Sequence, residues 1–158
     1  MMGKIAIGGL LETPDLVIIR LLGVKSGPGV AGSALTTLGR KGINVLCVVS
    51  SSDAGGKENM TLAVHKVDLD QALGLLQEVQ EQTDYEKIEY QDNCSLIAVY
   101  GPHFSDRPSI AGEMFDALAS ASINIRAIST SVSTVSCVID NDKLEEARNC
   151  IAQKFLIP

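Results

Sequence analysis

The sequence has few positively charged residues and lacks the features of nucleic-acid-binding proteins and of membrane proteins. Lysine and arginine together number 13 against 19 aspartates and glutamates, which gives a net charge of −6. Because nucleic-acid binding depends on clustered lysine and arginine, we expect no nucleic-acid partner. No stretch reaches the roughly 18 apolar residues of a membrane-spanning helix, and no basic region followed by an apolar run opens the chain. We therefore expect a cytoplasmic protein with no membrane partner.

Patterns of metal-binding and catalytic residues are also missing. The cysteines show no CxxC spacing and fall in apolar segments, so we expect reduced core thiols rather than disulfides or a metal site. No glycine-rich phosphate loop leads into a helix with a lysine, and no Ser-His-Asp, Cys-His or paired-carboxylate constellation is apparent. We expect no cofactor and no active site in this chain. The cysteines are Cys47, Cys94, Cys137 and Cys150.

The chain does contain an internal repeat. The 24 residues from Pro28 to Ser51, aligned without gaps to Pro108 to Ser131, are identical at seven positions. Self-similarity at one fixed offset indicates a small unit used twice, and 158 residues suffice for two units of about 70–80 residues each. The matched part comprises a loop, a helix start and the following strand. We therefore look for a binding site there.

The first unit has the predicted order β-α-β-β-α-β. An aliphatic run and a Gly-Pro-Gly turn precede a helix, and Gly42 ends that helix where a left-handed residue is favoured. A hairpin with two glycines follows, and then a second helix opened by a capping box at Asp68 and Gln71. The predicted strands are Asp15–Val24, Ile43–Ser52, Asn59–Lys66 and Tyr85–Gln91.

The second unit repeats this order but reaches the chain end before its fourth strand, with three residues left after Phe155. We expect the N-terminal strand Lys4–Leu11 to complete it, since a covered sheet edge removes an aggregation hazard. The first unit is then inserted in the second. The fold class is α+β: two ferredoxin-like βαββαβ units, each an antiparallel sheet with helices on one face. The predicted elements are strands 94–101, 123–131 and 133–139, helix 108–121, and a last helix capped by Asp142 with Glu145.

Units of this kind, with Pro-Gly between the first strand and the first helix, resemble the ACT domain, a small-molecule-sensing module. Gly-Ile-Asn-Val-Leu at 42–46 and Ile-Asn-Ile-Arg-Ala-Ile-Ser-Thr-Ser at 123–131 extend the resemblance to the paired regulatory domains of aspartate kinase, over essentially the whole chain. The resemblance implies ACT units at 13–93 and 94–158, the latter completed by 3–12. It also implies an allosteric amino-acid sensor that acts on a kinase catalytic subunit or domain. Such a sensor would control the biosynthesis of aspartate-family amino acids, including lysine.

Two features of the repeat suit an amino acid. The turns at 26–30 and 106–110 open helices, whose unpaired N–H groups attract a carboxylate. Asn44 and Asn124 follow at strand starts, each with an amide for an ammonium or a carboxylate. In the family resembled, the effector lies between the first unit of one chain and the second unit of its dimer mate, which implies a homodimer. The matching positions are Ser26, Gly29, Ala31, Ile43, Asn44, Val45 and Ser50, facing Ala111, Asn124 and Ile125.

Several positions depart from the family pattern. Ser26 and Val132 stand where the family resembled carries Asp and Glu, Ser50 where it carries Gln, and Ala111 where Thr is common. The two missing carboxylates remove the strongest partners for an ammonium. We therefore expect threonine rather than lysine as the effector, or a module that is purely architectural.

Other interpretations stay open at this point. Asn44 and Asn124 could cap turns at strand starts without any ligand. The chain could be a free-standing ACT-type module that serves another enzyme or a transcription system, or an independent enzyme or RNA binder. RNA-binding sheets of this topology display aromatic side chains on the central strands, where this chain offers only Tyr100.

Overall fold

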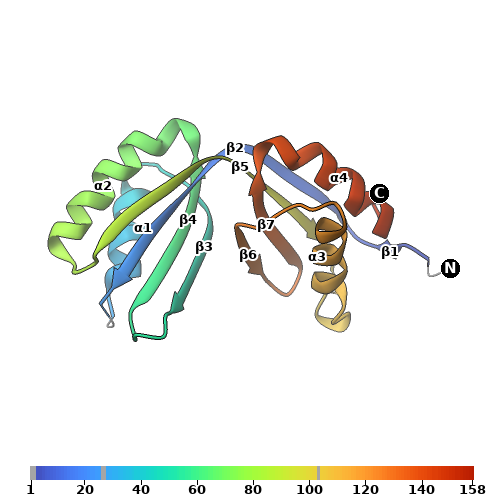
Figure 1. Cartoon of the computed structure of the whole chain (residues 1–158), viewed down its shortest axis with the longest axis horizontal. Helices are drawn as coiled ribbons and strands as arrows, with labels where there is room; N and C mark the ends of the chain where they lie inside the picture. Colours follow the sequence, from blue (N-terminus) through green and yellow to red (C-terminus); the bar gives the residue numbers. More distant parts are fainter. Residues whose placement is uncertain (1–2, 26–27, 103) are drawn as a thin grey trace. The chain divides into compact units, whose positions relative to one another are not determined.

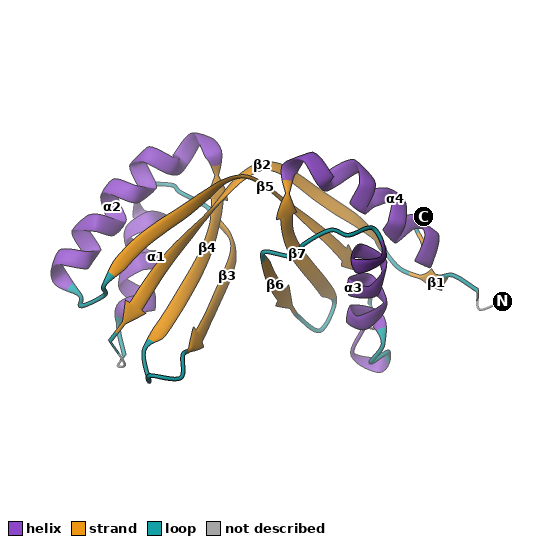
Figure 2. Cartoon of the chain, in the orientation of Figure 1, coloured by secondary structure: helices purple, strands orange, loops and turns teal. Residues whose placement is uncertain are grey.

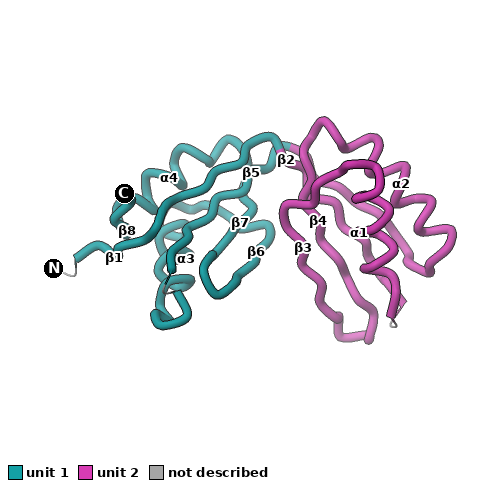
Figure 3. The backbone as a smooth tube through the Cα atoms, turned by 180° about the vertical axis from the view of Figure 1, so that it is seen from behind, with its two compact units in different colours: residues 1–15, 93–158 teal, residues 16–92 magenta. Residues whose placement is uncertain are grey.

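The computed structural model describes residues 3–25, 28–102 and 104–158, which form two compact units. One comprises residues 16–92, and we call it the inserted unit. The other comprises the residues up to 15 together with 93–158, and we call it the split unit (Figure 3). The chain passes from one unit into the other within two long strands, β2 (Gly9–Val24) and β5 (Lys87–Tyr100) (Figure 1).

The inserted unit is a sheet in the order β3–β4–β2–β5 with α1 (Val30–Arg40) and α2 (Leu69–Gln82) on one face (Figure 2). Strand β4 (Glu58–His65) pairs antiparallel with β2 and with β3 (Val45–Ser52). The two strands β3 and β4 are joined by a hairpin in which Asp53 Oδ1 accepts bonds from the N–H groups of Gly55 (2.8 Å) and Lys57 (3.0 Å).

The core of the inserted unit follows from the two periodicities of its sequence. Alternate residues of β2 point at the helices, and the helices bury positions three or four apart. Each such aliphatic side chain, fully buried, contributes roughly 1.5–3 kcal/mol. The fully buried members of this core are Val17, Ile19, Leu21, Ala34, Leu38, Leu62, Val64, Ala72 and Leu76.

The split unit has the sheet order β2–β5–β7–β6, with the N-terminal part of β2 beside β5. Strands β6 (Ala127–Thr130) and β7 (Thr134–Asp140) form an antiparallel pair, and β5 pairs antiparallel with β7. Helices α3 (Ile110–Ser120) and α4 (Leu144–Lys154) cover one face (Figure 2). The fully buried residues of this core are Ile97, Val99, Met114, Leu118, Cys137, Ile139, Ala147 and Ile151.

The predicted fold class is confirmed: two βαββαβ units have helices on one face of each antiparallel sheet, and the first is inserted in the second. The N-terminal segment supplies the strand that the second unit lacks. The structure adds one short pair, in which β1 (Ile5–Ala6) runs parallel to β8 (Phe155–Leu156).

Two of the breaks that we predicted between strands do not exist. Asp15–Val24 is not preceded by a break, because β2 runs without interruption from Gly9 to Val24, and β5 likewise joins the two strands predicted at 85–91 and 94–101. Asp15 and Asn93 have positive φ values of 57° and 56° at the points where these strands leave one unit for the other. A single left-handed residue bends the backbone without ending the strand, and Asp and Asn tolerate this conformation better than most residues.

The two predicted capping boxes are also wrong. One turn of 3₁₀ helix, Lys66–Asp68 and Asn141–Lys143, precedes α2 and α4. This turn already places Asp68 in a helical conformation, with φ −94° and ψ −1°, and no side-chain cap bond forms at either helix. An N-cap residue needs extended backbone angles for its side chain to reach the N–H groups of the first turn.

All four cysteines lie in the described part of the chain, and none is in a disulfide. Burial raises the pKa of the Cys47 and Cys150 thiols. Among the described residues, no group of three His, Cys, Asp or Glu side chains is placed to hold a metal ion. Within the same residues, every helix is too short or too polar to cross a membrane.

Candidate functional site

The repeat appears in the structure as one helix-to-strand junction built twice. The Ile43 N–H donates to the Leu38 carbonyl (3.1 Å), and the Ile123 N–H donates to the Leu118 carbonyl (3.0 Å). Gly42 and Ser122 turn the chain between them at φ values of 75° and 56°. In both units the isoleucine is buried and the next residue, an asparagine, is exposed. The identical Ile-Asn dipeptides of the sequence therefore serve the same local geometry.

Asn44 and Asn124 carry side-chain amides that make no hydrogen bond within the described part of the chain. The interpretation of these residues as turn caps finds no bond to support it. Backbone bonds close the turns instead, as in the Gly42 N–H to Gly39 carbonyl (3.0 Å) and the Ser122 N–H to Ala119 carbonyl (2.9 Å). Each amide thus offers a donor and an acceptor to an external partner.

Within the described part of the chain, the start of α1 is uncovered at Gly29. Its N-cap residue is Gly29, at φ 116° and ψ −28°, and no described atom lies within 4 Å of a Cβ built there. The first intrahelical bond is donated by Ser33 to the Gly29 carbonyl (2.9 Å), so the N–H groups before it have no helical acceptor. Ser26, which the sequence placed in this site, lies outside the described residues.

The start of α3 is built differently. A 3₁₀ turn, Phe104–Asp106, precedes it, and its N-cap residue Ser109 has a negative φ of −88°. The Ile110 N–H, which matches Val30 in the repeat, already donates to the Arg107 carbonyl (3.4 Å), and Ile110 is buried. The turn at 106–110 is therefore less available to a ligand than its counterpart in the inserted unit.

The remaining predicted positions fall in two groups, one in each unit. In the inserted unit, Ala31 and Ser50 are exposed and Val45 is half-buried at the start of edge strand β3. In the split unit, Ala111 and Ile125 are half-buried against the core. The structure places each group within its own unit.

The electrostatics near Asn124 are fixed by one ion pair. Arg126 donates from Nε and Nη2 to the two carboxylate oxygens of Asp140, both at 3.0 Å. This pairing lowers the pKa of Asp140 and raises that of Arg126. The cation next to the Ile-Asn-Ile segment is thus held by the protein's own carboxylate and is not an anchor for an anionic ligand.

Several cavities lined by described residues lie away from these positions, and most of their residues were not predicted. Two neighbouring cavities in the split unit, of about 370 and 460 Å³, share Gly8, Gly101 and Pro102. Another, of about 400 Å³, lies among Gly23 and Gly56 and the ion pairs Lys25–Asp84 and Lys57–Glu86 of the inserted unit. The only available signal was the clustering of glycine at Gly8-Gly9 and Gly101-Pro102, which indicates close backbone approach.

Paired βαββαβ units with a repeated helix-to-strand junction resemble a tandem of ACT-type modules. The family model described as "ACT domain" matches residues 97–155, within the split unit.

More particularly, the chain resembles the regulatory region of aspartate kinase over nearly its full length. It is 26% identical over 152 residues to Aspartokinase 2 of Bacillus subtilis, covering 96% of this chain and 37% of that relative. The chain therefore spans little more than a third of the curated relative. The ligand-free regulatory subunit of aspartate kinase from Thermus thermophilus superposes with a TM-score of 0.85 at 25% identity, covering 95% of this chain and 99% of that one. The structure of aspartate kinase from Synechocystis superposes with a TM-score of 0.89 at 25% identity, and the match covers 100% of this chain and 29% of that one.

Proposed function

We propose that this chain senses an amino acid and thereby controls an aspartate kinase in the cytoplasm, as feedback on aspartate-family biosynthesis. The observation that carries the proposal is the full-length likeness to a regulatory subunit, 95% of this chain against 99% of the other. The reduced cysteines are in keeping with a cytoplasmic location. Its partner is then a kinase catalytic domain, either in the same polypeptide or as a separate subunit.

The proposed effector site joins the open start of α1 to the two asparagine junctions. The carboxylate of the effector is bound by the N–H groups at Gly29 and Ala31, because a helix N-terminus favours negative charge. The ammonium meets backbone carbonyls and the amides at Asn44 and Asn124. Since these residues belong to two units, we assign ACT units to 13–93 and to 94–158 with 3–12. We further propose a homodimer in which the first unit of one chain faces the second unit of its mate.

Threonine suits this site better than lysine. Its hydroxyl matches Ser50 and the other polar, uncharged groups of the site, whereas the second ammonium of lysine needs a carboxylate. None of the described site residues supplies one, and a charged hydrogen bond is worth roughly 1.5–3 kcal/mol.

Calorimetry with single-site variants tests the site. Asn44→Ala and Asn124→Ala should each weaken threonine binding by roughly 1–3 kcal/mol, the penalty for a lost polar partner. Their stability should stay near that of the parent, since neither side chain makes a bond within the described fold. Asn149→Ala, an exposed asparagine on α4, is the matched control. Unchanged threonine binding in both site variants would exclude this site.

Sedimentation tests the dimer. A dimer at tens of micromolar protein supports the shared site, because each chain alone provides only half of its walls. A monomer at that concentration, with or without threonine, argues against it.

One second candidate is favoured by the departures from the family pattern at Ser26, Ser50, Ala111 and Val132. A free-standing ACT-type module that regulates another enzyme or a transcription system would tolerate these changes. Val132 is 76% exposed, so the fold itself does not require it. Aspartate kinase activity that responds to this chain and threonine favours the first function; binding of a ligand without any effect on the kinase favours the second.

A further inference from the structure

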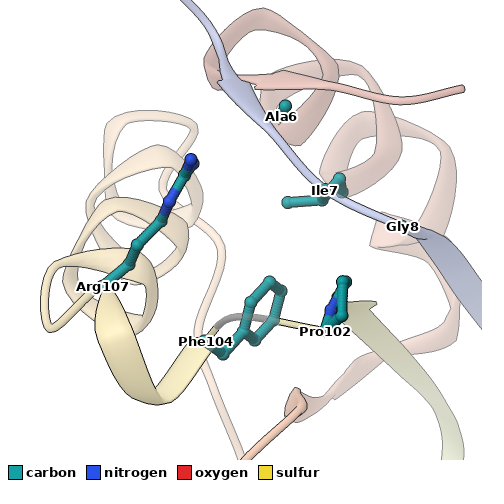
Figure 4. A pocket seen from close by; sticks show the side chains of 7 residues that line it. Ala6, Ile7, Gly8, Pro102, Phe104 and Arg107 are labelled. Atoms are coloured by element: carbon teal, nitrogen blue, oxygen red, sulfur yellow. The ribbon is translucent and has the colours of Figure 1, made fainter.

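The split unit contains a cavity between the N-terminal segment and the loop that follows β5. It has a volume of about 370 Å³, and we call it the Arg107 pocket. Figure 4 shows the rings of Phe104 and Pro102 on one side of it, Ile7 on the other, and the Arg107 side chain beside α3. It shares no residue with the proposed effector site. Its lining residues are Ala6, Ile7, Gly8, Gly101, Pro102, Phe104 and Arg107.

Two glycines make this pocket possible. The Gly8 N–H donates to the Tyr100 carbonyl (2.7 Å), and the Gly101 N–H donates to the Ser133 carbonyl (2.9 Å), so the two backbones pass close together. A Cβ at Gly101 would lie 2.7 Å from Cε1 of Phe104 and 3.3 Å from the Gly8 nitrogen. Any side chain at 101 would therefore displace the aromatic wall.

Among the described lining residues, Arg107 carries the only charge. The split unit has three arginines, and two of them form bidentate pairs, Arg126 with Asp140 and Arg148 with Glu12. Within the described part of the chain, Arg107 forms no ion pair. A planar guanidinium at the rim of an apolar cavity is suited to bidentate binding of a carboxylate.

We propose that the Arg107 pocket binds a small monocarboxylate with an apolar tail and no ammonium group. The carboxylate pairs with the Arg107 guanidinium, and the tail lies against Ile7, Pro102 and Phe104. None of the described lining residues is acidic, so the ammonium of an amino acid would lose its hydration without gaining a charged partner among them. The volume is at the small end of ordinary ligand pockets, about 300–1,000 Å³, which favours a tail of a few carbon atoms.

A bound ligand would contact the N-terminal segment directly. The N–H groups of Ile7 and Gly8 donate to the carbonyls of Leu156 (3.3 Å) and Tyr100 (2.7 Å), and these bonds attach the segment to the fold. Since a ligand that binds only the folded form adds stability, occupancy should slow hydrogen exchange at these two amides.

The test uses 4-methylpentanoate as the probe and amide NMR of the full chain as the readout. We expect saturable shifts at Gly8 and Gly101 and slower exchange at Ile7 and Gly8. Arg107→Gln should weaken binding at least tenfold, whereas Arg40→Gln, an exposed arginine on α1, should leave it unchanged. The isosteric alcohol 4-methylpentan-1-ol and the amino acid leucine should each bind at least tenfold more weakly than the acid.

Three results would overturn the proposal: no saturable shift at these amides, equal binding of acid and alcohol, or unchanged affinity in Arg107→Gln. Carboxylate binding in the Arg107 pocket does not depend on threonine binding at the proposed effector site. Threonine binding should be the same in Arg107→Gln as in the parent chain, so failure of one site is distinguishable from failure of the other.

Discussion

In the inserted unit α1 begins after Gly29 at φ 116°, whereas in the split unit α3 begins after Ser109 at φ −88°. The two helices nevertheless end in the same way, with an isoleucine N–H bonded to a leucine carbonyl five residues earlier. The repeat thus preserves the helix end and the strand start, while the loops before the helices differ.

This difference underlies the separate tasks that we propose for the two units. The left-handed glycine leaves the start of α1 open to a carboxylate. Before α3, the Ile110 N–H instead donates to the Arg107 carbonyl, and the 3₁₀ turn borders an apolar cavity through Phe104. Both units retain an exposed asparagine at the junction, so this residue is the shared element of the proposed effector site.

The largest expected effect comes from removing residues 1–12, which should destabilise the split unit and leave the inserted unit nearly unchanged. Ile7 and Leu10 belong to the core of the split unit, and their loss together with a strand should cost roughly 3–5 kcal/mol. Hydrogen exchange resolves the two units, and removal of residues 1–3 alone is the control. Greater loss of protection in 16–92 than in 94–139 would contradict the inserted arrangement.

Alkaline pH should act on the opposite unit. Burial raises the pKa of Tyr85, in the inserted unit, to about 12, and its hydroxyl donates to the Leu76 carbonyl. Because the folded pKa is raised, the stabilisation is fully present below the unfolded value near 10 and is lost between about pH 10 and 12. Two pKa units correspond to about 3 kcal/mol.

Urea unfolding across this pH range measures the effect. Tyr85→Phe should remove most of the alkaline loss, whereas Tyr90→Phe, with a side chain 56% exposed, should not. Equal pH dependence in the parent and in Tyr85→Phe would show that this phenol is not the responsible group.

A matched pair of substitutions tests the two helix starts directly. Gly29→Val should cost about 1–2 kcal/mol, because a β-branched residue is strained at φ 116°. Ser109→Val, at negative φ, should cost less than half of that. Gly29→Val should also abolish threonine binding by blocking the open helix start. Thermal unfolding and calorimetry measure the two effects, and similar stability loss in both variants would mean that the φ difference is not decisive.

The smallest expected effect concerns the ion pair beside Asn124. Asp140 has a lowered pKa through its bonds to Arg126, so its contribution is present above the unfolded pKa near 4 and is lost as the pH falls below it. Both side chains are about one-third exposed, which limits the contribution to roughly 0.5 kcal/mol. Acid unfolding of Asp140→Asn checks the sign: the variant should differ from the parent at neutral pH and converge with it near pH 3.

The structural features that follow from repeated patterns in the sequence could be predicted. The apolar periodicity gave the helices and the core, and the missing fourth strand of the second unit required a strand from the N-terminus. The 3₁₀ turns that replace the expected caps at Asp68 and Asp142 could not be predicted, since a 3₁₀ turn and an N-cap use the same residue types. The Arg107 pocket depends on contacts between residues about 90 positions apart, such as Gly8 and Gly101, which no local pattern encodes.

The most direct test of the effector site is a calorimetric titration of the chain with threonine and with lysine under the same conditions. We predict that threonine binds and that lysine binds more weakly by at least tenfold, because the described site has no carboxylate for a second ammonium. Tight lysine binding with no response to threonine would contradict it.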